Sequence, residues 1–237
     1  MFIVSKIFNP NDIKLVIDGG ASIGDTSEKL CNLFPLAEVH AFEPFPQFQE
    51  ILKQKVIANT KIISHEFALG DKNSLTTLNT NLSDGTNSLF KSNSKSKEIY
   101  GSLMDSTGGI KVQTIRLDDW MGSLEQQVID ILKLDIQGGE LQALNGANQI
   151  LKAGRIKCVI CEFMFEPSYE KQPSWIELAY KFESHGLRLF NLYQPHFFKG
   201  QLVQADLIFL NQSSLDSSEL RRGNSFFNYS NLVKADN

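Results

Sequence analysis

The sequence contains few cysteines and no long apolar run. Its 237 residues include three cysteines, an odd and small number that argues against a disulfide framework and for a reducing compartment. Cys158 and Cys161 lie three residues apart in an apolar run that reads as a strand. They should therefore face opposite sides of a sheet as buried thiols, rather than form a metal or redox pair. No uncharged run approaches the roughly 20 residues of a membrane helix, and no basic leader is present, so we expect a cytoplasmic protein without membrane contact.

The sequence also lacks an excess of basic residues. It has 23 Lys and Arg against 27 Asp and Glu, for a formal net charge of -4. Because a nucleic-acid backbone rewards a basic surface, nucleic acid is not an expected partner, and a small-molecule substrate is favoured. The hydrophobic content of 42% suffices for the core of one globular domain.

Short β-rich runs alternate with longer segments of helical period, which is typical of an α/β fold with a mostly parallel sheet. Strands are predicted over residues 15–18, 38–43, 61–67, 74–80, 111–117, 128–136, 156–162, 187–192 and 202–210, the last two as an antiparallel hairpin. Helices are predicted over residues 24–34, 48–56, 139–151 and 173–184. Residues 81–110 are polar and rich in Ser, Asn, Lys and Gly, which indicates a lid or substrate loop. We expect one domain over residues 1–210, followed by a polar tail over residues 211–237.

The run Asp18-Gly19-Gly20-Ala21-Ser22-Ile23-Gly24 follows the first predicted strand and should turn into a helix. This edge of an open α/β sheet binds ligands, and glycines let the backbone approach them. The spacing matches neither the G-x-G-x-x-G of dinucleotide sites nor a phosphate-binding loop. A carboxylate at Asp18 suits a ligand with an ammonium group and would repel a pyrophosphate.

Glu43 ends the second predicted strand, 43 − 24 = 19 residues after Gly24. An acidic residue at this spacing is well placed to accept hydrogen bonds from both hydroxyl groups of a ribose. The two elements together indicate a ribose-containing ligand.

Five segments resemble, in order and spacing, the FkbM family of methyltransferases over about residues 14 to 165. They are residues 18–26, 42–44, 67–71, 114–119 and 132–140. The resemblance implies a Rossmann-like class I methyltransferase sheet of seven mainly parallel strands, with the last strand antiparallel and helices on both faces. It also implies S-adenosylmethionine as cofactor and methyl transfer, commonly to an oxygen of a secondary metabolite or sugar. Family members typically carry a glutamate where this sequence has Gln137, which puts any charge-dependent role of that glutamate in question.

The site residues follow from these motifs. Cofactor binding is expected at Asp18, Gly20, Ala21, Ser22, Gly24, Glu43, Pro44, Ala68 and Asp135. Asp135 should also face the reacting atoms, and Glu140 and Glu162 could approach the same cavity. Three crowded carboxylates suit either a general base or a divalent metal, although Glu140 is equally explained as a first-turn acid of a helix. His196, in a loop with aromatic neighbours, is a further candidate base.

Other residues have structural explanations. Asp118 and Asp119 are expected to end a strand and cap the turn before Trp120, and His40 and His65 are expected to be packed within strands.

The sequence leaves several functions open. The favoured one is an O-methyltransferase acting on a small molecule such as a secondary metabolite, a sugar or a peptide-derived acceptor. A non-catalytic cofactor-binding module is an alternative, raised by Gln137. An NAD-dependent oxidoreductase is disfavoured by the missing dinucleotide fingerprint. The oligomeric state is open, with a homodimer as one possibility.

Overall fold

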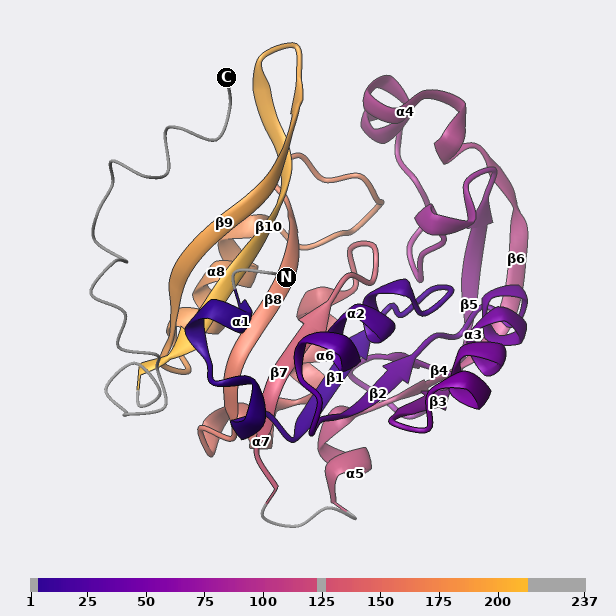
Figure 1. Cartoon of the computed structure of the whole chain (residues 1–237). Helices are drawn as coiled ribbons and strands as arrows, with labels where there is room; N and C mark the ends of the chain where they lie inside the picture. The colour runs from indigo at the N-terminus through magenta and orange to yellow at the C-terminus, as the bar shows by residue number, and fades with distance from the viewer. Residues whose placement is uncertain (1–3, 123–126, 213–237) are drawn as a thin grey trace, which may run out of the picture.

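The computed structural model describes residues 4–122 and 127–212, and its centre is a seven-stranded sheet (Figure 1). The strand order is β3-β2-β1-β7-β8-β10-β9. Strands β3, β2, β1, β7 and β8 pair in parallel, whereas β10 is antiparallel to both β8 and β9. Their bounds are β1 Leu15–Gly19, β2 Glu38–Phe42, β3 Ile62–His65, β7 Ile129–Leu134, β8 Ile156–Met164, β9 Leu187–Phe198 and β10 Gln201–Asn211. The predicted α/β sheet, with its antiparallel strand and final hairpin, is confirmed.

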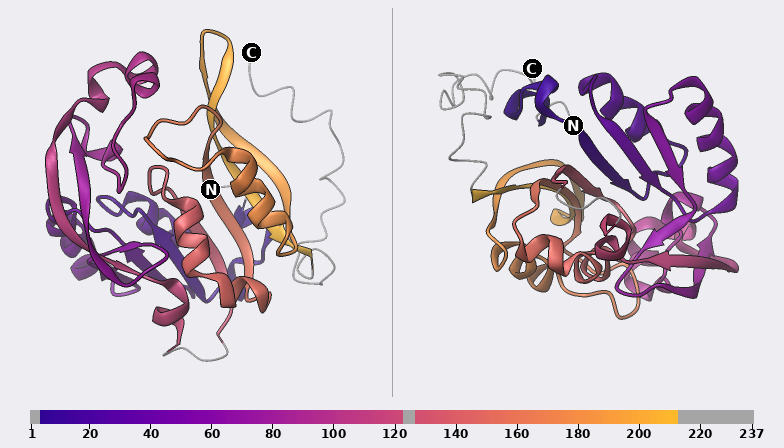
Figure 2. Two further views of the ribbon diagram at one scale, coloured as in Figure 1. Left: turned by 180° about the vertical axis from the view of Figure 1, so that it is seen from behind. Right: turned by 90° about the horizontal axis from the view of Figure 1, so that it is seen from below.

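Helices cover both faces of the main sheet (Figure 2). One apolar layer joins α1 (Val4–Ile7), α2 (Asp25–Leu33) and α3 (Pro46–Ala58) to the sheet. The other joins α5 (Leu117–Met121), α6 (Glu140–Gly146), α7 (Asn148–Lys152) and α8 (Trp175–Glu183). Cys158 belongs to the first layer and Cys161 to the second, and both are free thiols, so the prediction that they face opposite sides is correct. Strands covered on both faces need apolar side chains throughout, which explains the near-continuous apolar runs of β1 and β7.

A second, three-stranded sheet extends the molecule beyond β3. Its order is β4-β6-β5, with β4 Phe67–Leu69, β5 Ser74–Asn81 and β6 Ser106–Ile115. The sequence predicted one strand over residues 61–67, but the chain leaves the main sheet after His65 and Phe67 pairs in the second sheet instead.

The polar segment 81–110 is more structured than predicted. It contains the short 3-10 helices η2 (Asp84–Thr86) and η3 (Gly101–Met104) and the helix α4 (Ser94–Tyr100). Strand β6 also begins at Ser106 rather than at residue 111, because Gly108 and Gly109 pair with Thr80 and Asn79 of β5. Glycine is a weak signal for a strand, so the sequence placed these residues in a loop.

The predicted helix over residues 139–151 is two helices, α6 and α7, separated at Ala147. The cause is Asp118, whose carboxylate accepts hydrogen bonds from the backbone N–H groups of Gln149 and Ile150 at the start of α7. Asp118 and Asp119 lie in the first turn of α5, so the expectation that they cap the turn before Trp120 is wrong for Asp118, which caps a distant helix.

Helix α8 agrees with the prediction over residues 173–184, whereas β9 extends to Phe198 and includes the predicted loop that contains His196, and α1 was not predicted. Helix α8 begins with a capping box between Ser174 and Glu177, and Gly186 follows it with φ +75°. Of the predicted tail, Asn211 and Gln212 are described and residues 213–237 lie outside the described part of the chain. No helix within the described ranges has the length and apolar character needed to span a membrane.

Candidate active site

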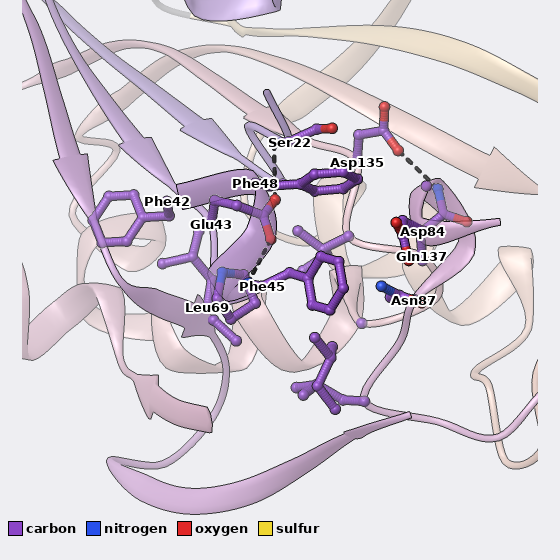
Figure 3. A pocket seen from close by; sticks show the side chains of 18 of the residues that line it. Ser22, Phe42, Glu43, Phe45, Phe48, Leu69, Asp84, Asn87, Asp135 and Gln137 are labelled. Atoms are coloured by element: carbon purple, nitrogen blue, oxygen red, sulfur yellow. Dashed lines mark hydrogen bonds between the residues drawn. The ribbon is translucent and has the colours of Figure 1, made fainter. Parts of the chain in front are cut away.

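The carboxyl ends of β1, β2 and β7 meet around a cavity of about 320 Å³ at one edge of the main sheet (Figure 3). Parallel strands place their carboxyl ends at the same edge, so the loops after them face one space. Among the residues predicted from sequence, the cavity is lined by Gly20, Ser22, Glu43, Pro44, Ala68, Asp135 and Glu162. The predicted lid contributes Asp84, Gly85, Asn87 and Leu89 to the same lining. Motifs that are far apart in the sequence therefore share one cavity, which we call the first cavity.

The loop after β1 passes very close to the loop after β7. Gly20 has φ +77°, and a Cβ atom there would lie 1.9 Å from the carbonyl oxygen of Asp135. Only glycine fits this position. Gly24, at φ +83°, packs against Leu52 of α3, and Ala21 is buried, so neither of these two predicted residues lines the first cavity.

Glu43 follows β2 and is 6% exposed. Its Oε2 accepts from the Ser22 N–H at 2.8 Å and its Oε1 from the Phe45 N–H at 2.8 Å (Figure 3). Burial raises the pKa of Glu43 to about 7, although these two hydrogen bonds oppose the shift. Each carboxylate oxygen has a second lone pair, so Glu43 can still accept hydrogen bonds from two ligand hydroxyls.

A buried lysine holds two of the predicted carboxylates together. Lys133 Nζ lies 3.7 Å from Asp18 Oδ1 and 3.2 Å from Asp135 Oδ2. Burial alone would lower the pKa of Lys133, but Asp135 and Asp18 hold it above its ordinary value, so the lysine is charged. Asp18 is fully buried, accepts from Ser27 Oγ at 2.7 Å and does not line the first cavity. Its contacts support the loop and the position of Asp135.

Sequence reasoning missed Lys133, although a signal was present. A lysine between Leu132 and Leu134 in a fully buried strand needs a charge partner, because an unpaired buried charge is very costly. The two strand-end aspartates are that partner.

Gln137 joins the two carboxylates that line the cavity wall. Its Nε2 donates to Asp135 Oδ1 at 3.0 Å and to Glu162 Oε2 at 3.0 Å. Its Oε1 accepts from the Tyr169 hydroxyl at 2.9 Å. Glu162 also accepts from Gln204 Nε2 at 2.5 Å. A glutamate at position 137 could not donate both hydrogen bonds, so the glutamine suits this pair of acids.

Glu162 is the most perturbed acid of the site. Burial raises its pKa well above the ordinary range, and the neighbouring carboxylates of Asp135 and Glu140 raise it further, while Lys133 opposes the shift. A raised pKa makes the carboxylate of Glu162 a stronger base than an ordinary glutamate.

Glu140 and His196 do not join this group. Glu140 Oε1 accepts from the N–H groups of Ile136 and Gly138 at 3.1 and 3.2 Å, so its carboxylate fixes the turn before α6. His196 lies on the exposed part of β9, stacked on Tyr100 at 5.8 Å, and does not line the first cavity. His40 and His65 are packed beside Trp120, as expected.

The acids are not arranged as a set of metal ligands. Within the described ranges, no group of three or more His, Cys, Asp or Glu residues is arranged to hold a metal ion. The space between Asp135 and Glu162 is bridged by the amide of Gln137, which is a hydrogen-bond donor. The hydrogen bonding here fits a pair of acids acting on protons.

The fold resembles that of a solved methyltransferase. The crystal structure of methyltransferase FkbM from Methylobacillus flagellatus superposes with a TM-score of 0.53 at 17% sequence identity. The match covers 84% of this chain and 44% of that chain, so this chain spans less than half of that protein.

Sequence comparisons give the same family. The chain is 25% identical over 182 residues to 2-O-methyltransferase NoeI of Sinorhizobium fredii, covering 72% of this chain and 70% of that protein. It is 24% identical over 146 residues to Methyltransferase 1 of Beauveria bassiana, covering 57% of this chain and 59% of that protein. The family model described as Methyltransferase FkbM domain matches residues 18–189. This range is most of the sequence and contains every strand end that lines the first cavity, so the chain belongs to the FkbM family of S-adenosylmethionine-dependent methyltransferases.

Proposed function

We propose that this enzyme transfers the methyl group of S-adenosylmethionine to a hydroxyl oxygen of a small organic molecule. The observation that carries the proposal is the pair of acids Asp135 and Glu162, joined by Gln137 at the wall of the first cavity. A hydroxyl becomes a good nucleophile when a base accepts its proton. The similarity to a relative named as a 2-O-methyltransferase supports oxygen as the methylated atom. The family assignment sets aside the oxidoreductase alternative.

The residues of the first cavity suit S-adenosylmethionine, which supplies an electrophilic methyl group on a sulfonium sulfur. Glu43 keeps lone pairs free for the two ribose hydroxyls. Phe45 and Leu78 offer apolar surface to the adenine base. Asp135 offers a negative charge to the ammonium and sulfonium groups.

Glu162 is the best placed base. Its two oxygens each accept one amide N–H, from Gln137 and Gln204, which fixes the plane of the carboxylate. A lone pair remains on each oxygen for an incoming hydroxyl. Because burial and neighbouring acids raise the pKa of Glu162, its carboxylate is a stronger base than an exposed glutamate.

The proposal is tested with the full chain, methyl-labelled S-adenosylmethionine and a panel of small hydroxyl, amine and carboxylic acid compounds. We expect a labelled methyl ether, identified by NMR and by its resistance to alkaline hydrolysis. A product methylated only on nitrogen or on a carboxylate would contradict the proposal.

Three variants separate the roles of the acids. Glu162→Gln should lower kcat by roughly 100-fold or more, as expected for loss of a general base, with cofactor affinity retained in calorimetry. Asp135→Asn should reduce transfer while affecting cofactor affinity less than Glu43→Ala does. Glu183→Gln, on the exposed last turn of α8, is the matched control and should leave both unchanged.

A further inference from the structure

A second, smaller cavity lies beside the first. It has a volume of about 160 Å³ and shares Gly85, Gln137 and Glu162 with the first cavity. Gln137 and Glu162 therefore form part of the wall between the two. The rest of its lining comes from the lid, from β8 and the loop after it, and from β10, as Thr86, Tyr100, Met104, Met164, Ser168, Tyr169 and Gln204.

The lining of the second cavity is polar but nearly uncharged. Among the described residues that line it, Glu162 is the only one with a carboxylate, and none is Lys, Arg or His. The Tyr100 hydroxyl donates to Gln204 Oε1 at 2.8 Å, so the two form a hydrogen-bonded pair beside Glu162. Met104 and Met164 pack with Tyr169 as an apolar floor. Hydroxyl and amide groups above an apolar floor match a molecule that carries several hydroxyls on a carbon frame.

One hydroxyl of this lining has hydrogen-bonding capacity to spare. Ser168 is 1% exposed, and its Oγ lies beside the Tyr100 hydroxyl without a well-formed hydrogen bond to any described residue. A buried hydroxyl without a partner is costly, so its retention at a cavity wall points to a ligand that supplies the partner.

We propose that the second cavity binds the methyl acceptor, as one ring-sized unit of a neutral polyhydroxy compound. The inference rests on the proposed function, because it places the reacting hydroxyl at the shared wall, next to Glu162. The second cavity has half the volume of the first, about 160 Å³ against about 320 Å³, which suits a single ring rather than a large polycyclic molecule.

Methyl transfer takes place at the shared wall. The acceptor oxygen forms a bond to the methyl carbon while the carbon–sulfur bond breaks and its electron pair stays on sulfur. The hydroxyl proton passes to the Glu162 carboxylate. An anionic acceptor is repelled by Glu162 and the nearby Asp135, and a protonated amine paired with Glu162 has no free lone pair for attack.

The experiment compares three probes that share one ring, namely methyl glucoside, methyl glucuronide and methyl glucosaminide. Binding to the full chain saturated with S-adenosylhomocysteine is measured by ligand-observed NMR. We expect the neutral glucoside to bind more tightly than either charged analogue. Ser168→Ala and Tyr100→Phe should each weaken its binding by roughly three- to tenfold, the worth of one neutral hydrogen bond. Tyr180→Phe, at a tyrosine of α8 that is 73% exposed, is the matched control and should change nothing.

Ser168→Ala removes a costly buried hydroxyl, so the thermal midpoint of this variant should be no lower than that of the wild type, and a loss of ligand binding cannot be ascribed to a loss of folding. Equal or tighter binding of a charged analogue, no glucoside binding, or unchanged binding in both cavity variants would overturn the inference. Transfer to oxygen of another compound would then leave the proposed function standing. Binding of the glucoside with transfer only to nitrogen would instead contradict the proposed function.

Discussion

Gln137 is a neutral donor between two acids, and its backbone is unusual as well as its side chain. Its φ of +55° lies in the left-handed region, where a residue other than glycine is uncommon. The Ser88 hydroxyl donates to its carbonyl oxygen at 2.6 Å, and the Tyr169 hydroxyl donates to its side-chain oxygen. These contacts fix both ends of the residue, so the amide nitrogen can face only Asp135 and Glu162.

Gln137→Glu should therefore impair this enzyme. The change replaces two N–H donors by a third carboxylate and should lower kcat/KM at pH 7 by roughly tenfold or more, from the loss of charge-assisted hydrogen bonds. Because a further negative charge raises the pKa of Glu162, the acid limb of the pH–rate profile should move to higher pH. Gln54→Glu, exposed on α3, is the control for added charge. An unchanged pH profile would argue against the bridging role.

Glu140 offers a test of pH-dependent stability. Burial raises its pKa to about 7 from an ordinary value of 4.5, so the folded state binds a proton more tightly than the unfolded state does. Its contribution to the free energy of unfolding is complete below pH 4.5 and is lost as pH rises through 7. Glu140→Gln keeps an oxygen for the N–H groups of Ile136 and Gly138 but does not titrate. Relative to wild type, this variant should gain stability of about 3 kcal/mol between pH 4.5 and 8, measured by urea unfolding. A difference that does not vary with pH would contradict the assignment.

The strand-end acids could be predicted from sequence, and most of their partners could not. Glu43 and Asp135 follow apolar runs, and parallel strands bring such positions to one edge. Tyr169 and Gln204 reach the site through contacts that span 32 and 42 residues, to Gln137 and Glu162. No local pattern encodes those distances, because they depend on how the loop after β8 and the strand β10 pack.

At the scale of elements, the loop after β1 and the loop after β7 depend on each other. The close approach of Gly20 to the Asp135 carbonyl oxygen leaves no room for a side chain. Gly186 has a similar φ of +75°, but a Cβ there would meet nothing within 4 Å. An alanine at position 186 would therefore introduce backbone strain alone, whereas an alanine at position 20 would add a steric clash.

Gly186→Ala should cost about 1 kcal/mol, the strain of a left-handed alanine, with cofactor affinity unchanged. Gly20→Ala should cost more than this and should abolish cofactor binding, because the loops must move apart. Urea unfolding and calorimetry with S-adenosylhomocysteine measure the two effects. Equal stability losses with cofactor binding intact in both variants would show that the loop contact is unimportant.

Most helices and strands could be predicted from the sequence, but the residues at which some of them begin and end could not. The apolar runs of β1, β7 and β8 are unambiguous, since buried strands need them. The break between α6 and α7 was missed because its cause, Asp118, lies 31 residues before Gln149. Tertiary contacts of this kind override a periodic helix pattern.

At the scale of the whole molecule, the lid lines both cavities, and the loop after β8, through Ser168 and Tyr169, lines the second. Asn93 Nδ2 donates to the Pro167 carbonyl at 2.8 Å, and the Asn93 N–H donates to the Ser168 carbonyl at 3.1 Å. The Glu170 N–H donates to the Lys91 carbonyl at 2.7 Å. We call this contact between residues 91–93 and 167–170 the seam. Its hydrogen bonds hold the lid against the loop after β8, and we call these two segments together the roof of the site.

Asn93→Asp should loosen this seam while keeping α4 intact. The carboxylate can still accept from the Ser96 N–H and cap α4, but it cannot donate to Pro167. We expect faster amide hydrogen exchange in residues 91–93 and 168–170 and a KM for the acceptor raised by roughly three- to tenfold, the worth of a lost hydrogen bond. Asn93→Ala loses the cap as well and should also expose the amides of α4. If both variants exchange like wild type, the seam does not hold the roof.

The segment that contains the lid begins with β5 and ends with β6. The first residue of β5 pairs with a residue near the end of β6. Ser74 pairs with Thr114, and the Ser74 N–H donates to Thr114 Oγ1 at 3.2 Å. The two ends of the segment 75–113 therefore stay close together, whatever the number of residues between them. The entropic cost of closing such a loop rises only slowly with its length. This stretch can change in length and sequence while its two ends stay in place, so descendants of one ancestral enzyme could acquire new acceptors through changes in it, provided that Leu78 keeps its place at the cofactor cavity.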